Sequence, residues 1–209
     1  WGLTESDLAD VVATPPAAFV IGSVALVIEP GSRAIERSAT LLHESGETTV
    51  VIDVNIRPGL GFDRDAERAR IERQIQIAHI VKASDEDIAW LYSADEVETI
   101  AAVWSRSGRA IVVTRGASGA TLYLDGNRIT DVPAPRIDLV DTVGAGDSFL
   151  GATLFGLQER DALGSDATAR LRALAPAEWT DVLSLAARVG AITCSRAGCN
   201  PPTRAELQL

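Results

Sequence analysis

Residues 140–152 read Val-Asp-Thr-Val-Gly-Ala-Gly-Asp-Ser-Phe-Leu-Gly-Ala, and the interpretation of the whole chain starts from this stretch. Gly144, Ala145 and Gly146 leave backbone N–H groups uncovered by side chains, and an apolar helical pattern begins directly after them. The start of a helix has unpaired N–H donors and the positive end of the helix dipole, so it favours an anion, most often a phosphate. Asp147 falls in the same first turn, where a carboxylate opposes anion binding. Such a carboxylate has a use if it accepts the proton of a hydroxyl that attacks phosphorus.

Two common phosphate-binding loops do not fit this stretch. A P-loop has Lys after its last glycine, and no Lys follows Gly146. A dinucleotide-binding fingerprint has a third glycine three residues after Gly146, where this sequence has Phe149. Close helix packing would explain a short run of small residues, but the full stretch 140–152 fits a catalytic mechanism at many positions.

Composition indicates a globular α/β protein. The chain has 209 residues, 46% of them hydrophobic, and a mean hydropathy of +0.13. Its net charge of −10 argues against nucleic acid as a partner. No apolar run approaches the roughly 20 residues of a membrane span, so no membrane partner is expected. The two cysteines, Cys194 and Cys199, suit neither a disulfide framework nor a zinc site, which predicts a reduced, cytoplasmic setting.

The first residue is Trp1, and the sequence contains no Met. We therefore expect either that residues were omitted or that this is the later part of a longer protein.

Strand-like and helix-like segments alternate along the chain, which predicts an α/β fold with a mostly parallel sheet and helices on both faces. The predicted strands are residues 18–22, 48–54, 78–82, 110–114, 120–124 and 128–132. The predicted helices are residues 4–12, 32–43, 63–76, 84–91, 95–107, 145–158, 166–175 and 178–194. Asp125-Gly126-Asn127 predicts a hairpin between the last two strands, which are therefore antiparallel. No linker divides the chain, so residues 1–209 are interpreted as one domain.

Polar or glycine-rich segments follow three of the predicted strands, and the carboxyl ends of parallel strands are where such sheets bind ligands. These segments contain Asn55 and Arg57, then Lys82, Ser84 and Asp87, then Thr114, Gly116 and Gly119. Each also has an ordinary explanation: a surface Arg beside a Pro turn, a helix N-cap with acidic residues after it, and a tight hairpin. His43 and His79 are interpreted as structural residues.

The stretch 140–152 closely resembles the C-terminal signature of the ribokinase-like (PfkB) sugar kinases. The resemblance covers essentially the whole chain, aligned with the later part of the family, and implies a three-layer α/β/α ribokinase-like fold. It implies that Asp147 is the catalytic base and contacts the substrate, and that Gly144, Ala145 and Gly146 form the anion hole. It also places Asn55 and Arg57 at the substrate, with Arg57 pairing with the transferring phosphoryl group. The family's N-terminal portion, with its β-lid and most sugar contacts, is expected to be absent.

The resemblance further implies ATP and Mg²⁺, and K⁺ as a further cation. Nucleotide contacts are expected from Lys82, Ser84, Asp87, Thr114, Gly116, Gly119, Gly146 and Asn200. The monovalent cation is expected at Asp141, Val143, Thr193, Arg196 and Gly198. Ser84 and Asp87 stand where the family has the Asn and Glu of its Asn-x-x-Glu motif, so a direct metal contact is left open; Asp87 can reach a metal through water.

The acceptor is left open by the residues themselves. Residues 25–30, 53–58 and 195–202 look more like fructokinases than ribokinases or adenosine kinases. Ribose, 2-keto-3-deoxygluconate or a nucleoside are alternatives within the same family, and a nucleotide-binding fragment without catalysis is an alternative of another class. A nicotinamide-dependent oxidoreductase is disfavoured by Phe149, and a homodimer is left open.

Overall fold

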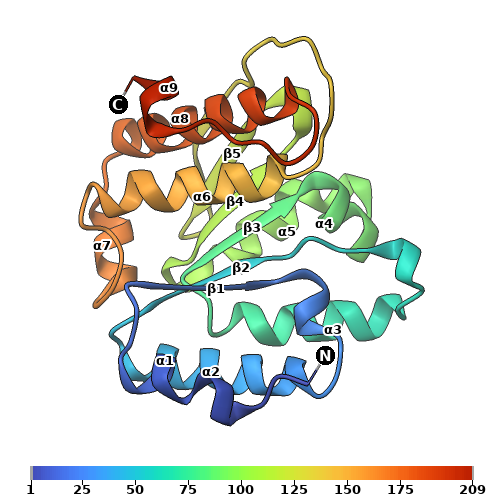
Figure 1. Ribbon diagram of the computed structural model, residues 1–209, viewed down its shortest axis with the longest axis vertical. Coiled ribbons are helices and arrows are strands. Elements are labelled where there is room, and N and C mark those ends of the chain that lie inside the picture. Colours follow the sequence, from blue (N-terminus) through green and yellow to red (C-terminus); the bar gives the residue numbers. More distant parts are fainter. Residues whose placement is uncertain (1, 209) are drawn as a thin grey trace.

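The computed structural model describes residues 2–208, apart from the side chain of Asp95. In this part of the chain, strands pair side by side in sequence order, from β1 to β6, in one six-stranded sheet (Figure 1). Four of them, β1 (Ala18–Gly22), β2 (Thr49–Asp53), β3 (Ile80–Ser84) and β4 (Ala110–Thr114), are parallel. Their carboxyl ends therefore meet at one edge, as the alternating pattern predicts.

An antiparallel hairpin of β5 (Ala120–Leu124) and β6 (Asn127–Val132) completes the sheet. The turn consists of Asp125 and Gly126, whose φ angles are +50° and +80°. Two positive φ angles are what a two-residue hairpin turn requires, because they match the twist of the strands. The hairpin prediction is confirmed, with β6 beginning one residue earlier than expected.

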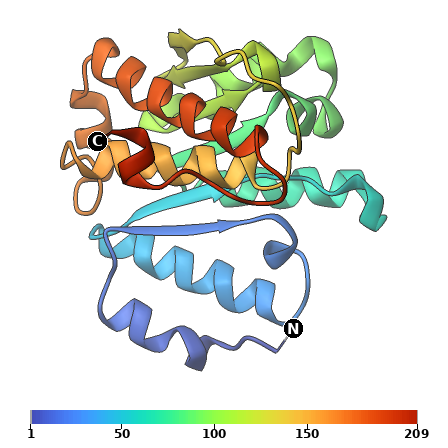
Figure 2. The same ribbon diagram turned by 45° about the horizontal axis from the view of Figure 1, so that its top comes forward.

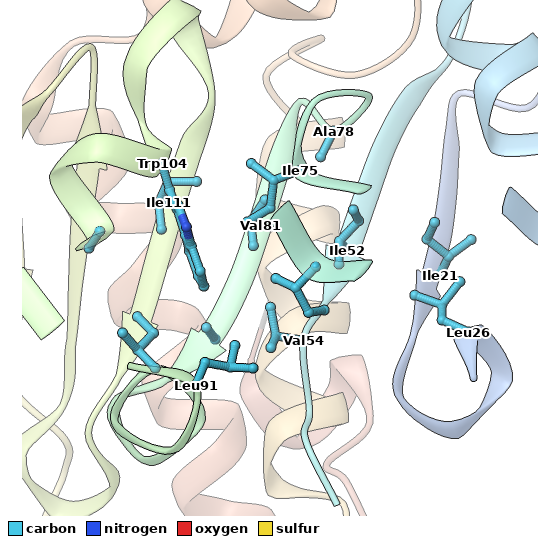
Figure 3. Close-up of a cluster of buried hydrophobic side chains, with 14 of the residues drawn as sticks. Ile21, Leu26, Ile52, Val54, Ile75, Ala78, Val81, Leu91, Trp104 and Ile111 are labelled. Atoms are coloured by element: carbon cyan, nitrogen blue, oxygen red, sulfur yellow. The ribbon is translucent and has the colours of Figure 1, made fainter. Parts of the chain in front are cut away.

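Helices cover both faces of the sheet. The first face packs on α2 (Gly31–Ser45), α3 (Arg64–Ile75), α4 (Asp85–Leu91) and α5 (Val97–Trp104). Figure 3 shows the apolar core on this face, where Ile52, Val81 and Ile111 point at the helices. The opposite face packs on α6 (Ala145–Gln158), α7 (Ala167–Ala173) and α8 (Pro176–Cys194). In Figure 2, β1 and β2 lie between α2 below and α6 above, which confirms the three-layer α/β/α prediction.

Short elements complete the described chain. These are α1 (Ala9–Ala13) and α9 (Arg204–Leu207), with 3₁₀ turns at Glu5–Leu8, Ser23–Leu26, Pro58–Leu60, Ala94–Glu96, Arg106–Gly108 and Gly116–Ser118. The predicted helix 4–12 is thus a 3₁₀ turn followed by one short α-helix. Within the described residues, no helix is both long and apolar enough to cross a membrane.

Most predicted elements differ from the structure by one or two residues at an end, and two of the differences have a clear local cause. β3 begins at Ile80 and not at Ala78, because the amides of Ile77 and Ala78 bond to the end of α3 in a turn. The strand accordingly continues to Ser84, which places Lys82 in its middle. The predicted helix 95–107 is α5 with a 3₁₀ turn at each end, since Ser107 and Gly108 have φ angles of +65° and +84°.

Candidate active site

The first turn of α6 lies at the edge of the sheet where the parallel strands end. Gly144 precedes the helix with φ = +76°, and a Cβ there would lie 2.1 Å from the Cys199 Sγ atom. Position 144 therefore suits only glycine, for reasons of backbone conformation and space. In the described part of the chain, no hydrogen bond occupies the amides of Gly146 and Asp147, and no side chain caps the helix. These amides are the donors that a helix offers to an anion.

Asp147 is exposed and lines two cavities at this edge. One cavity, of about 380 Å³, extends to Asp53, Asn55 and the apolar residues of β1. The other, of about 450 Å³, lies between α6, α8 and the C-terminal segment, and includes Phe155. A carboxylate at this position can meet a hydroxyl in the first cavity while the adjacent amides meet a phosphate.

Asp53 and Lys82 form a buried ion pair beside this turn. The Lys82 Nζ atom lies 2.9 and 3.0 Å from the two carboxylate oxygens of Asp53. Burial raises the pKa of the Asp53 carboxyl, while the charge of Lys82 opposes that rise. Sequence reasoning identified Lys82 but missed Asp53; the signal was an acidic residue at the end of an otherwise apolar strand.

Asp87 and Ser84 begin α4 as a capping box. The Asp87 carboxylate accepts the amide of Ser84 at 2.8 Å, and the Ser84 hydroxyl accepts the amide of Asp87 at 3.0 Å. The other Asp87 oxygen accepts the amide of Ile56 at 2.8 Å, which ties the segment after β2 to α4. Both oxygens of Asp87 are thus engaged by backbone, and its role toward a metal or nucleotide stays a prediction.

Asn55 and Arg57, the two residues predicted at the substrate, both lie in the segment after β2, but only Asn55 lines a cavity. Asn55, with φ = +40°, lines the smaller cavity together with Asp53 and Asp147. Arg57 is exposed and does not line that cavity. Its guanidinium has a contact of 3.5 Å with the carbonyl of Ile56, at the limit of a hydrogen bond. Contact between Arg57 and a phosphoryl group stays a prediction.

The turn between β4 and β5 contains the two glycines predicted at the nucleotide. Gly119 has φ = +96°, and a Cβ there would lie 2.0 Å from the carbonyl oxygen of Val132. Packing of the hairpin therefore explains this glycine. Gly116 has φ = +48° and open space around its Cβ position, so its backbone is accessible. Thr114 is half-buried at the end of β4, at the same edge of the sheet.

The residues predicted at a monovalent cation come together where the end of α8 meets the segment before α6. Asp141 accepts the amides of Val143 at 3.0 Å and Gly198 at 2.9 Å, and these bonds lower the pKa of its carboxyl. The amide of Arg196 bonds to the carbonyl of Thr193 at 3.2 Å. Asn200 is exposed in the segment that follows. Figure 1 shows this red segment beside the yellow segment that leads into α6.

Among the described residues, no three His, Cys, Asp or Glu side chains form a metal-binding group. Mg²⁺ in kinase sites is commonly held by one or two carboxylates, water and the phosphates themselves. The two histidines lie elsewhere: their rings are 4.9 Å apart, and His79 Nδ1 accepts the amide of Val50, which agrees with a structural role.

Known proteins are similar to this chain in sequence and in fold. The model of the pfkB family of carbohydrate kinases matches residues 12–206. A fructokinase from Rhizobium leguminosarum bv. trifolii is 36% identical over 157 residues, which are 75% of this chain and 47% of that protein. The chain thus spans about half the length of this curated relative.

Two solved structures share the fold. Fructokinase with bound ATP from Xylella fastidiosa has a TM-score of 0.79 at 22% identity, over 95% of this chain and 61% of that one. Aminoimidazole riboside kinase from Salmonella enterica, complexed with aminoimidazole riboside and an ATP analog, has a TM-score of 0.72 at 26% identity. That comparison covers 94% of this chain and 62% of the other.

Proposed function

Since this chain belongs to the pfkB family of carbohydrate kinases, we propose that the protein transfers a phosphoryl group from ATP to a sugar hydroxyl. The observation that carries the proposal is the position of Asp147. Its carboxylate is exposed to a cavity at the edge of the sheet, directly beside two backbone amides that have no acceptor in the described chain.

Asp147 acts as the general base. The hydroxyl oxygen of the sugar forms a bond to the γ-phosphorus, and its proton passes to the Asp147 carboxylate. The bond between the γ-phosphorus and the oxygen that bridges to the β-phosphate breaks, and ADP leaves with the electron pair. Because such transition states are loose, alignment of the reactants contributes more than the strength of the base.

The turn Gly144–Gly146 supplies the anion hole. The Ala145 amide donates to the carbonyl of Thr142 at 3.2 Å, so the donors without an acceptor in the described chain are the amides of Gly146 and, directly after it, Asp147. Their dipoles favour the negative charge of the transferred group and need no reorganisation during the reaction. Nucleotide contacts come from Lys82, Ser84, Asp87, Thr114, Gly116, Gly119, Gly146 and Asn200. Of these, Gly116 offers accessible backbone, whereas Gly119 has a packing reason that is independent of any nucleotide.

Mg²⁺ would be held chiefly by phosphate oxygens and water, with a contact from Asp87 through water. It would neutralise phosphate charge, which this acidic chain otherwise repels. K⁺ would lie at Asp141, Val143, Thr193, Arg196 and Gly198. The hydrogen bonds from Val143 and Gly198 to Asp141 support that grouping.

Fructose is our first choice of acceptor, supported by the fructokinase relative. The likeness to aminoimidazole riboside kinase keeps a riboside acceptor as the second candidate, beside ribose and 2-keto-3-deoxygluconate. Within this chain, the acceptor would contact Asn55 and the β1 residues that line the smaller cavity, which are residues 19–22. A nucleotide-binding protein without catalysis is the alternative of another class.

The test compares Asp147→Asn with Asp138→Asn in the complete gene product, with fructose, ribose, 2-keto-3-deoxygluconate and aminoimidazole riboside as acceptors. Asp138 is a suitable control because it is also an exposed carboxylate, in the segment that leads into α6. We expect Asp147→Asn to lower kcat by about 10²–10⁴-fold, as removal of a general base does, with ATP affinity changed only a few-fold. Asp138→Asn should keep wild-type kinetics, and full activity of the Asp147 variant would refute the assignment.

A further inference from the structure

Asp53 and Lys82 lie where their side chains reach the first turn of α6. They are register partners on the parallel strands β2 and β3, and each is only 6% exposed. Side chains alternate between the faces of a strand, so these two share a face with Val51 and Ile80. Val51 and Ile80 belong to the core that packs on α6 and α8. The ion pair therefore points toward α6.

Lys82 fills the space beneath Gly146. A Cβ at position 146 would lie 3.0 Å from the Lys82 Nζ atom and 3.6 Å from Cε. The ammonium thus lies directly below the last residue of the proposed anion hole. A Cβ at position 146 would require the ammonium of Lys82 to shift by a few tenths of an ångström, and both described hydrogen bonds of this ammonium go to Asp53.

Stability does not explain this arrangement. A buried ion pair often contributes no more to folding than apolar residues of similar volume. The positive end of a helix dipole also repels a cation, so an ammonium under the first turn of α6 is unfavourable in the absence of an anion. With a phosphoryl group on the turn, the ammonium and the free amides all attract the same negative charge.

We propose that Asp53 is a positioning residue for phosphoryl transfer, which holds the Lys82 ammonium beneath the first turn of α6 and so adds positive charge to the anion hole. This inference rests on the proposed function. It assigns Asp53 an action through Lys82, without contact between Asp53 and either substrate. The surrounding charges support it: Asp87 and Asp147 both raise the pKa of the Asp53 carboxyl, and Lys82 is the cation that opposes them.

The experiment is a double-mutant cycle in the complete gene product, with Asp53→Asn, Lys82→Met and the two combined. We expect Lys82→Met and Asp53→Asn each to lower kcat by at least about 10-fold, because an electrostatic contact to the transition state is lost or displaced. Because the lost contact is strongest in the transition state, kcat should fall by a larger factor than the KM for ATP rises. If Asp53 acts only through Lys82, the double variant should have the same kcat as Lys82→Met.

The double variant also separates positioning from a purely structural role. It contains no unpaired buried charge, so we expect its melting temperature to return toward the wild-type value. A structural role predicts that kcat returns with it, whereas the positioning role predicts that kcat stays low. Glu67→Gln is the matched control, since the Glu67–Arg70 pair is also buried but lies within α3. It should lower the melting temperature and leave kcat unchanged.

Three results would overturn the inference and leave the proposed function intact. Wild-type kcat in Asp53→Asn would remove any role in the reaction, and recovery of kcat in the double variant would make the pair structural. A further loss from Asp53→Asn in the Lys82→Met background would show an action that does not pass through Lys82. A wild-type protein that phosphorylates none of the sugars would overturn the proposed function itself, and this inference with it.

Discussion

At the scale of single residues, His79 links the fold to pH. Its ring is buried beside His43, and burial lowers its pKa from the usual 6.5 to about 4. Its Nδ1 atom accepts the amide of Val50 at 3.0 Å, which requires an unprotonated nitrogen. Between pH 6.5 and pH 4 the unfolded chain therefore binds a proton that the folded chain does not. Folding stability should fall as the pH is lowered through this window.

We expect His79→Asn to reduce that dependence, because the Asn side chain keeps an acceptor near the Nδ1 position and has no proton to gain. The measurement is urea unfolding of wild type and variant at several pH values between 7 and 4. The wild type should lose more stability over this range than the variant does, whatever their difference at pH 7. Parallel pH profiles would show that His79 does not titrate as described.

Substitutions of Arg57 test whether its guanidinium binds the transferred phosphoryl group. We expect Arg57→Ala to lower kcat/KM in the complete gene product, and Arg57→Lys to recover only part of the loss. A guanidinium can donate two parallel hydrogen bonds to phosphate oxygens, and an ammonium cannot reproduce that geometry. Because Arg57 is exposed, neither change should affect the melting temperature. Wild-type kinetics in Arg57→Ala would mean that it is a surface residue beside a turn.

At the scale of elements, the two glycines of the β4–β5 turn allow the effect of packing to be tested separately from nucleotide binding. Gly119→Ala would bring a Cβ to 2.0 Å from the Val132 carbonyl, whereas Gly116→Ala meets nothing within 4 Å. Both substitutions carry the strain of a positive φ, about 1–3 kcal/mol. We therefore expect Gly119→Ala to be clearly the more destabilising in chemical unfolding.

The same two variants also test whether the turn binds the nucleotide. Gly116→Ala should weaken ADP binding in isothermal titration calorimetry, because its backbone is the accessible one of the two. If the folded fraction of Gly119→Ala binds ADP as the wild type does, Gly119 is explained by packing alone. Equal unfolding free energies for the two variants would contradict the close approach to Val132.

At the scale of the whole molecule, the chain is shorter than the kinases that it resembles. It covers 47% of the Rhizobium fructokinase and 61% of the Xylella one. At one edge of the described sheet, β1 pairs only with β2, and Val20 on it is 47% exposed. An uncovered strand edge with apolar side chains favours association with another chain.

We expect residues 1–209 alone to bind ADP weakly, to self-associate in sedimentation velocity, and to phosphorylate fructose little or not at all. Alignment of two reactants and exclusion of water can contribute about 7–11 kcal/mol, which Asp147 by itself cannot supply. The control is the complete gene product in the same ATP-dependent assay. Comparable kcat/KM in both proteins would show that the acceptor site lies within these residues.

The sequence alone determined the elements and the candidate site. Alternating apolar patterns located the strands, Asp125-Gly126 predicted the hairpin, and Ser84 with Asp87 predicted the start of α4. These features are local, because dihedral preferences, capping and side-chain periodicity act within a few residues. Resemblance to the family added roles for Asp147 and Gly144–Gly146, which stay predictions.

Only the tertiary structure decided which of these residues touch. In the structure, Asp53 pairs with Lys82 beneath Gly146, and both oxygens of Asp87 accept backbone amides. The close approach of Gly119 to the Val132 carbonyl shows that packing requires a glycine there. The alternation of side chains along a strand indicates to which face of the sheet a side chain points. It does not indicate which residue of the helix on that face the side chain contacts. That depends on strand register and on the packing of α6 against the sheet, which brings Lys82 beside Gly146, 64 positions later in the sequence.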